Sequence, residues 1–139
     1  MGMVIFDRHG IRSEKKIDIR PPNEDFVHSG IHGITWFDVC DSPTFEEMWP
    51  EISQIISEAD YLVAHNAAFD KSVLKACCEY YELAYQSRQW LCTFRDVAKH
   101  LWPNLENHKL PTVCRELGIP IVHHDGLSDA RACAKIVLA

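Results

Sequence analysis

The segment Tyr61–Ala64 constrains the fold more strongly than any other part of the sequence. It is an apolar run of strand length with no polar face, and such a strand is typical of the interior of a sheet that is covered on both sides. Asn66, a favourable residue for the start of a helix, follows almost at once. Beyond it, apolar residues recur at helical spacing along one stripe: Phe69, Val73, Ala76, Cys77 and Tyr80. We therefore predict an interior strand that leads directly into an amphipathic helix.

The residues around this unit predict a β-hairpin and several helices. Residues 1–6 are apolar, a turn at residues 7–10 contains glycine, and residues 11–19 alternate imperfectly between apolar and polar, as in a hairpin. Residues 90–93 predict another short strand, which runs into a helix. Three more helices are predicted from capping residues or apolar periodicity, with starts at Thr44, Asn107 and Leu127. The order of these elements predicts an α/β layered domain with a small mixed sheet.

The last two helices have the most regular patterns. The helix capped by Asn107 has apolar residues at helical spacing and is predicted to end at Gly118. The final helix begins near Leu127 or Ser128, which places Asp129 in its first turn. Its predicted inward face consists of Leu127, Ala130, Ala134, Val137 and Leu138.

The composition fits one domain and gives no general reason for binding nucleic acid. The chain has 139 residues, of which 47% are hydrophobic, enough for a single core. No apolar run is long enough to cross a membrane and the start is not typical of a signal peptide, so we expect no membrane partner and a cytoplasmic location. The formal net charge is −6 and no basic run is present, so contact with nucleic acid must depend on a local site.

Two aspartates, Asp70 and Asp129, each lie in the first turn of a predicted helix. Helical side chains lean back toward the helix N-terminus, so both carboxylates can project into one space beside the sheet. Carboxylate oxygens favour Mg²⁺ or Mn²⁺ over zinc. The alternative is that each aspartate only complements a helix macrodipole, an interaction worth less than ~1 kcal/mol.

His124 is the candidate proton acceptor. It precedes Asp129 by five residues, in the loop that enters the same helix. Histidine ordinarily changes charge near neutral pH, which suits it to accept a proton from a water molecule. The neighbouring residues His123 and Asp125 are alternatives for the polar group that matters at this position.

Several motifs along the chain resemble one nuclease family. Residues 63–70, Val-Ala-His-Asn-Ala-Ala-Phe-Asp, and the pair His124 and Asp129 are similar to the second and third motifs of the DEDDh exonucleases, the family of the epsilon proofreading subunit of bacterial DNA polymerase III. Shorter similarities occur in the same order as in that family: Arg20-Pro21-Pro22, Ile31-His32-Gly33-Ile34-Thr35, Cys92-Thr93 and Asn107-His108-Lys109-Leu110. The resemblance covers essentially the whole chain.

The resemblance implies a ribonuclease-H-like α/β fold, a mixed sheet with flanking helices, that removes nucleotides from a nucleic-acid 3′ end. In that family two ions, ~3.5–4 Å apart, activate water and stabilise the leaving oxygen. Carried over, Asp70 and Asp129 are metal ligands for Mg²⁺ or Mn²⁺, and His124 deprotonates the attacking water. The expected partner is a single-stranded 3′ end, together with a polymerase or a second copy of the chain.

The same resemblance implies a set of substrate-binding residues. Asn66 is expected to shape the site, and the segment near the terminal nucleotide is expected to consist of Ile31, His32, Gly33 and Ile34. For His32 an equally good interpretation is a loop histidine that caps or solvates its turn.

One part of the family pattern is missing. The family begins with a strand that carries Asp-x-Glu, whereas only about twenty residues precede Pro21, enough for the hairpin alone. Asp7 imitates the motif but falls in the hairpin turn, so we reject it as a substitute. We therefore expect residues 1–139 to be a single exonuclease-like domain, N-terminally truncated and lacking its first, central strand, with impaired hydrolysis.

Two alternatives to an active nuclease follow from the same residues. The first is a catalytically disabled module of the same fold, which binds a nucleic-acid end or a partner protein. The second is a transition-metal site among His108, Cys114, His123 and His124. The six cysteines include no C-x-x-C pair and lie mostly in apolar periodic stretches, so we expect buried free thiols instead of disulfides or a zinc cluster.

Overall fold

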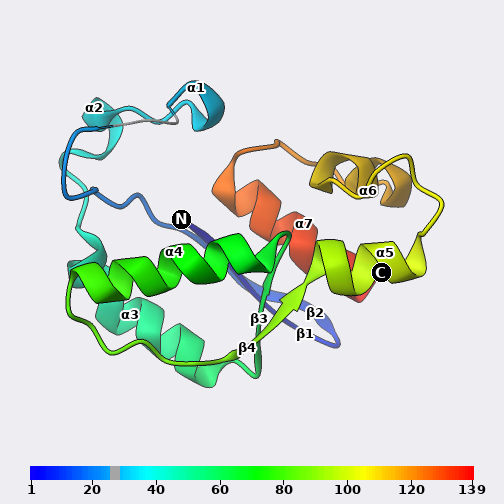
Figure 1. Ribbon diagram of the computed structural model, residues 1–139, viewed down its shortest axis with the longest axis horizontal. Helices are drawn as coiled ribbons and strands as arrows, with labels where there is room; N and C mark the ends of the chain where they lie inside the picture. The colour runs from blue at the N-terminus through cyan, green and yellow to red at the C-terminus, as the bar shows by residue number, and fades with distance from the viewer. Residues whose placement is uncertain (26–28) are drawn as a thin grey trace.

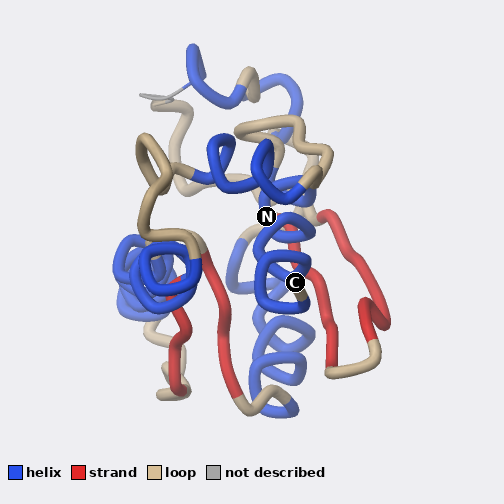
Figure 2. The backbone as a smooth tube through the Cα atoms, turned by 90° about the vertical axis from the view of Figure 1, so that its right-hand side faces the viewer, coloured by secondary structure: helices blue, strands red, loops and turns tan. Residues whose placement is uncertain are grey.

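The structure, a computed structural model, describes residues 1–25 and 29–139, and its strands form two separate pairs (Figure 1). Strands β1 (Gly2–Asp7) and β2 (Gly10–Lys16) form the predicted antiparallel hairpin. Strands β3 (Tyr61–Ala64) and β4 (Gln89–Cys92) pair in parallel. Within the described residues no strand pairing joins one pair to the other, and Figure 2 shows the two pairs apart.

The hairpin is held at both of its ends. Gly10 has a φ of 127° at the turn, a conformation that favours glycine. The second strand ends at Lys16, whereas the sequence predicted that it extends to residue 19. Pairing nevertheless continues for one more residue, because Ile17 donates its backbone N–H to the Met1 carbonyl at 2.8 Å and accepts from the Met1 amino group at 2.6 Å.

Helices make up most of the remaining chain. Three of them are short: α1 (Ser29–His32), α2 (Trp36–Val39) and α5 (Lys99–Leu101). A π-helical segment η1 (Thr93–Ala98) follows β4 directly. The longer helices are α3 (Phe45–Glu58), α4 (Ala67–Tyr80), α6 (Leu110–Leu117) and α7 (Gly126–Leu138). No helix in the part of the chain that the structure describes is long and apolar enough to cross a membrane.

Local sequence signals account for the helix ends only in part. The capping box before α3 is formed: Thr44 donates its backbone N–H to the Glu47 carboxylate at 2.7 Å, and its hydroxyl accepts the Glu47 N–H at 3.2 Å. Helix α6 ends at Gly118, which has a φ of 65°. The prediction that Asn107 is its N-cap was wrong by two residues, because Asn107 accepts the backbone N–H of Lys109 and so turns the chain before the helix begins.

Two buried clusters form the core. One joins the interior faces of α6, η1 and α7: Ala98, Leu110, Val113, Cys114, Ala132, Cys133 and Ile136. The other lies under α3 and α4 and includes the residue after the hairpin: Ile17, Phe45, Trp49, Ile52, Ile56 and Cys78. All six cysteines are free, as expected, and four of them are buried.

Most of the predicted apolar stripe of α4 does not face the core. Phe69, Val73 and Tyr80 are exposed by 64%, 46% and 65% of their surfaces. Of the predicted stripe, Cys77 packs against the second cluster, together with Leu74 and Cys78, which the prediction did not include. Because apolar residues occupy more than one face of this helix, its periodicity could not select the buried one.

The prediction that β3 is an interior strand of the sheet is not met within the described residues. Within the described residues β3 pairs with β4 alone, and Tyr61 is 57% exposed. The edge of β3 toward the hairpin therefore has no strand beside it, which leaves its backbone groups on that side without a ladder partner.

Helix α7 connects the two strand pairs, since it contacts β1, β2 and β3. Arg131 forms a two-pronged pair with Glu14 on β2, with both N···O distances at 2.7 Å, and Lys16 pairs with Asp125 at 2.7 Å. The predicted inward face was therefore incomplete: Leu138 is 38% exposed, and the buried residues of α7 are Ser128, Ala132, Cys133, Ala134 and Ile136. A helix that contacts elements on several sides buries more than one stripe.

Replacing Gly2 with alanine should separate β1 from α7. A Cβ atom at Gly2 would lie 2.2 Å from the Gly126 carbonyl carbon, which is backbone and cannot rotate away. We expect Gly2→Ala to lower the free energy of unfolding by about 1–3 kcal/mol, the range for overpacking. Gly30→Ala is the matched control, because a Cβ there meets nothing within 4 Å. Urea unfolding measures both variants, and equal stabilities would contradict this close contact.

Candidate active site

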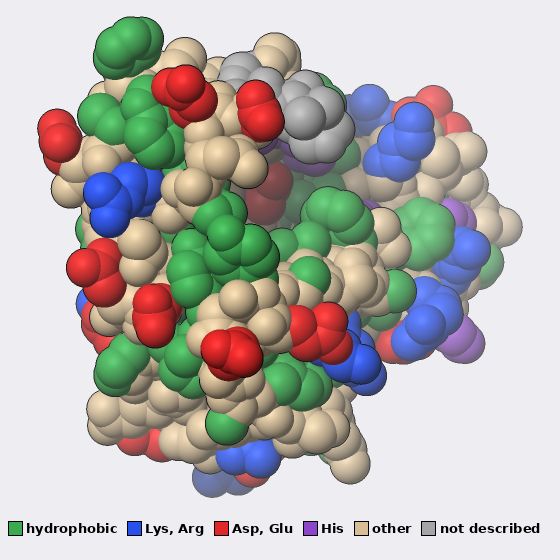
Figure 3. All heavy atoms as spheres, turned by 60° about the vertical axis from the view of Figure 1, so that its left-hand side comes forward, with side chains coloured by type: hydrophobic (Ala, Val, Ile, Leu, Met, Phe, Trp, Pro, Cys, Tyr) green, Lys and Arg blue, Asp and Glu red, His purple; other side chains and the backbone are tan. Residues whose placement is uncertain are grey.

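A pocket of about 830 Å³ lies where β1, β3, α4 and α7 approach one another. Met1 and Gly2 form one wall, and Val63 and Ala64 form another, so the unpaired sides of the two strand pairs border it. The pocket is also lined by the three residues to which the sequence assigned chemistry: Asp70, His124 and Asp129. Figure 3 shows a hollow that contains a recessed acidic side chain, with apolar side chains along its lower rim.

Asp70 lies in the first turn of α4, as predicted. Although the residue as a whole is exposed, desolvation raises the pKa of its carboxyl group. The hydrogen bond from its own backbone N–H lowers this pKa, and the negative charge of Asp129 raises it. The two carboxylates therefore repel each other across the pocket. A cation between them would relieve this repulsion.

Asp129 lies in the first turn of α7 and has a buried oxygen atom without a hydrogen bond. Asp125 caps the helix by accepting the Ser128 N–H at 2.9 Å, which fixes the turn that holds Asp129. The Oδ1 atom of Asp129 is buried without a hydrogen-bond partner, and the nearest basic atom, Nδ1 of His123, is 3.5 Å away, beyond a good hydrogen bond. A buried carboxylate oxygen in this state is suited to bind a cation.

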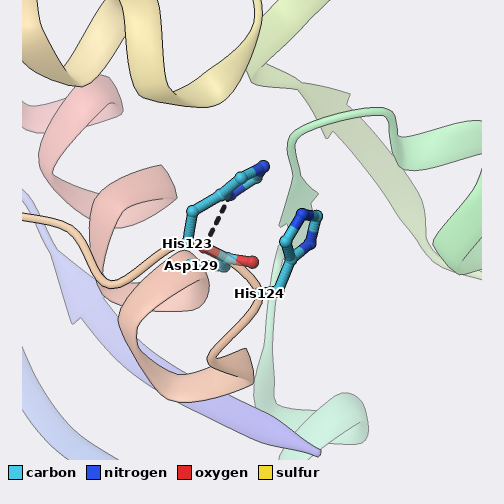
Figure 4. A group of neighbouring side chains, drawn as sticks. All are labelled: His123, His124 and Asp129. Atoms are coloured by element: carbon cyan, nitrogen blue, oxygen red, sulfur yellow. Dashed lines mark ion pairs between the residues drawn. The ribbon is translucent and has the colours of Figure 1, made fainter. Parts of the chain in front are cut away.

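His124 reaches the pocket from a strained position. Its φ is 68°, in the left-handed region that non-glycine residues rarely adopt, and its ring lies 3.8 Å from that of His123. Of the two alternatives to His124, Asp125 is occupied by the helix cap and by Lys16. His123 is not occupied in this way, and Figure 4 shows its ring beside His124 and Asp129.

His65 is the residue of this site whose role the sequence analysis missed. Its Nε2 lies 2.8 Å from the His108 carbonyl oxygen and its Nδ1 lies 2.9 Å from the Thr93 hydroxyl. Because a carbonyl can only accept, we assign the proton to Nε2, so that Nδ1 accepts from Thr93. His65 thus ties the junction between β3 and α4 to two distant segments. Only its place between a strand and a helix was visible in the sequence, since its partners are 28 and 43 residues away.

The predicted substrate-binding residues are only partly assembled. Asn66 lines the pocket and has a φ of 100° at the N-cap position, where its side chain makes no capping hydrogen bond. The residues of α1 and the following loop are not among those that line the pocket: Ile31, His32, Gly33 and Ile34. His32 accepts the Ile34 N–H at 3.1 Å, consistent with the turn-capping interpretation. Their roles toward substrate stay predictions.

Of the four residues of the alternative transition-metal site, His123 and His124 come together, whereas His108 and Cys114 are engaged elsewhere. The Nε2 atom of His108 is 3.0 Å from the Trp102 carbonyl, and Cys114 is fully buried in the core, where desolvation raises the pKa of its thiol to about 11. A protonated thiol in an apolar cluster is a poor metal ligand. Asp7 is the last residue of β1, directly before the hairpin turn, where it accepts the His9 N–H at 2.7 Å and pairs with Arg12 at 2.8 Å, and it does not line the pocket.

The residues of the pocket fit a hard divalent ion. Asp70 and Asp129 supply oxygen ligands from two helices, and the Oδ1 of Asp129, which is buried without a hydrogen bond, is available to a cation. Mg²⁺ commonly binds through one or two carboxylates and keeps several waters. The described residues that line the pocket include no third carboxylate, so they suffice for one such ion more readily than for two.

Comparison with known proteins identifies the family. The model of the Exonuclease family, RNase_T, matches residues 2–137. The chain belongs to this family. The DNA polymerase III PolC-type of Caldanaerobacter subterraneus subsp. tengcongensis is 32% identical over 118 residues, which are 84% of this chain and 8% of that protein. The exonuclease-family domain therefore spans only a small part of the length of this relative.

Solved structures agree on the fold. The nuclease domain of 3′hExo, a DEDDh family member bound to rAMP, superposes with a TM-score of 0.81 at 19% identity, over 99% of this chain and 76% of that one. Exonuclease X in complex with 5′ overhanging duplex DNA gives a TM-score of 0.76 at 24% identity, over 97% and 76%. The chain therefore has the mixed α/β, ribonuclease-H-like fold of these exonucleases over nearly its whole length, as the sequence predicted.

Replacing His65 with alanine should reduce both stability and its dependence on pH. Desolvation lowers the pKa of His65, partly offset by the His108 carbonyl and by Asp129, so the folded state disfavours the charged ring. The contribution of His65 to the free energy of unfolding should therefore be largest at pH values above ~6.5, the pKa of histidine in the unfolded chain. It should fall as the pH drops from there toward the lower pKa of His65 in the folded protein. His65→Ala should cost about 1–3 kcal/mol at pH 7.5 and show a smaller fall toward pH 5.5.

Urea unfolding at these two pH values measures the effect. His9→Ala is the matched control, because His9 lies exposed in the hairpin turn. An unchanged pH dependence in His65→Ala would rule out the neutral, doubly hydrogen-bonded state assigned to His65.

Proposed function

We propose that this domain hydrolyses nucleotides one at a time from the 3′ ends of nucleic acid by a two-metal mechanism. The observation that carries the proposal is the meeting of Asp70, His124 and Asp129 in one pocket, with a buried Asp129 oxygen that lacks a hydrogen bond. Membership of the exonuclease family supports it. The ions would be Mg²⁺ or Mn²⁺, held by Asp70 and Asp129, and they supply activation of water and stabilisation of the leaving oxygen.

The protein groups then have distinct tasks. Asp70 and Asp129, placed by the first turns of two different helices, fix the ions relative to the cleaved phosphate. His124 accepts the proton of the attacking water, a task that suits an imidazole exposed at the mouth of the pocket. Asn66, whose amide is free of any capping bond, shapes the site, and the segment Ile31 to Ile34 contacts the terminal nucleotide.

We propose further that the space between β1 and β3 receives one more strand. Both strands lack a pairing partner on the side that borders the pocket, within the described residues. Backbone groups left without partners in a dry region cost about 1–3 kcal/mol each. A strand with Asp-x-Glu would satisfy them and raise the carboxylates of the site from two to four. It would come from upstream residues of a longer protein or from a second copy of this chain.

The proposed substrate is a single-stranded 3′ end. The similar 3′hExo domain is bound to rAMP, and the similar exonuclease X is in complex with 5′ overhanging duplex DNA, so both kinds of nucleic acid are reasonable substrates to test. The net charge of −6 supports recognition at a local site instead of along an extended basic surface. Similarity to part of a PolC-type polymerase makes a polymerase a reasonable partner.

A catalytically disabled module is the second candidate function. The observation that favours it is the presence of only two carboxylates, Asp70 and Asp129, among the described residues of the pocket. With half of the ligands of a two-ion site, the domain would hold a nucleic-acid end without cleaving it.

Degradation of 5′-labelled single-stranded DNA and RNA tests the proposed function. The protein is made as the 139-residue chain and with an added N-terminal strand that carries Asp-x-Glu. We expect the extended protein to shorten at least one of the two substrates from its 3′ end in the presence of Mn²⁺. Asp70→Ala and Asp129→Ala should each abolish this cleavage. His124→Ala should reduce the rate about 10²–10⁴-fold, the usual contribution of a proton acceptor.

Two controls make the assay specific. An extension with Asn-x-Gln tests the added carboxylates separately from the added strand, and Asp60→Ala tests an exposed aspartate outside the pocket. Full activity in both Asp70→Ala and Asp129→Ala would overturn the nuclease proposal. Binding of the oligonucleotide without cleavage by the extended protein would favour the disabled module.

A further inference from the structure

A cluster of three potential ligands lies at the mouth of the pocket. His123 and His124 stand in the loop before α7, and Asp129 lies one turn into that helix. One ligand atom from each residue lies within 4.8 Å of the other two, and Figure 4 shows the three side chains beside one another. The His123 Nδ1 and Asp129 Oδ1 atoms are 3.5 Å apart.

These three groups differ chemically from the hard-ion site proposed above. Two imidazole nitrogens and one carboxylate oxygen form a mixed set that suits zinc, whereas Mg²⁺ prefers oxygen ligands alone. Zinc bonds of roughly 2.0–2.1 Å in tetrahedral geometry place neighbouring ligand atoms about 3.4 Å apart. One pair of the cluster already has this spacing, and exposed imidazole rings can rotate to bring in the third atom.

The backbone beneath the cluster is fixed while its rings are exposed. Val122 donates its N–H to the Ser128 hydroxyl at 2.8 Å, and Asp125 donates its N–H to the Val122 carbonyl at 3.1 Å. Lys16 holds Asp125 from β2 at 2.7 Å. The loop therefore presents both histidines in one place, beside an Asp129 Oδ1 atom that is buried without a hydrogen bond and lies 3.5 Å from His123 Nδ1.

We propose that His123, His124 and Asp129 bind one Zn²⁺ ion, and that zinc held there blocks hydrolysis. The blocking follows from the ligands: a nitrogen of His124 that coordinates zinc can no longer accept a proton, and Asp129 is shared with the hard-ion site. This consequence rests on the function proposed above, while the binding of zinc does not. His123 would then control the inhibition by zinc.

Equilibrium dialysis of the untagged 139-residue chain against Zn²⁺ tests the site, with Co²⁺ absorption as a second readout. We expect one Zn²⁺ per chain and a Co²⁺ spectrum typical of nitrogen and oxygen ligands. His123→Ala and His124→Ala should each weaken Zn²⁺ binding at least tenfold, with circular dichroism to confirm folding. His9→Ala, in the exposed hairpin turn, is the matched control and should bind as the wild type does. Absence of micromolar binding, or equal binding by all variants, overturns the proposal.

An activity measurement separates this proposal from the proposed function. In the extended protein with Mn²⁺, each protein is compared with its own cleavage rate in the absence of Zn²⁺, and His123→Ala should need at least tenfold more Zn²⁺ for half-inhibition. Equal inhibition of wild type and His123→Ala overturns the blocking role. A protein that binds zinc through these residues but never cleaves contradicts the nuclease proposal and leaves the zinc site supported by the dialysis result.

Discussion

The packing of α7 against both strand pairs is the contact on which the rest of the structure depends. No strand pairing joins the pairs within the described residues, so the helix holds them in place. It is joined to the hairpin by the Arg131 and Glu14 pair, by Lys16 and Asp125, and by the close approach of Gly2 to Gly126, and it also contacts β3. The same helix carries Asp129 in its first turn, so the geometry of the site follows from this packing.

The site is electrostatically incomplete, and this is the central feature of the molecule. The Asp129 charge contributes to the raised pKa of Asp70, and a buried oxygen of Asp129 has no donor. Both features raise the free energy of the folded chain alone, and a bound cation would lower it. The strained His124 and the hydrogen-bonded His65 lie around the same pocket, in keeping with a site whose local strain is tolerated because it serves chemistry.

The sequence predicted those parts of the fold that depend on residues a few positions apart in the chain. The hairpin turn at Gly10, the capping box at Thr44 and the end of α6 at Gly118 all follow from nearby residues. The meeting of Asp70 and Asp129 followed from the lean of side chains in the first turn of a helix. The buried face of α4 and the partners of His65 were not predicted, because they depend on segments far away in sequence. His123 could not be distinguished from its neighbours until the loop conformation was known.

We propose that Asp70 and Asp129 are half of a two-ion site whose other half belongs to a strand between β1 and β3. A titration with Mn²⁺, followed by electron paramagnetic resonance of the free ion, tests this proposal in the 139-residue chain and in the form extended by an Asp-x-Glu strand. We expect two bound ions in the extended form and at most one in the shorter chain. Two tightly bound ions together with nuclease activity in the shorter chain would contradict the proposal.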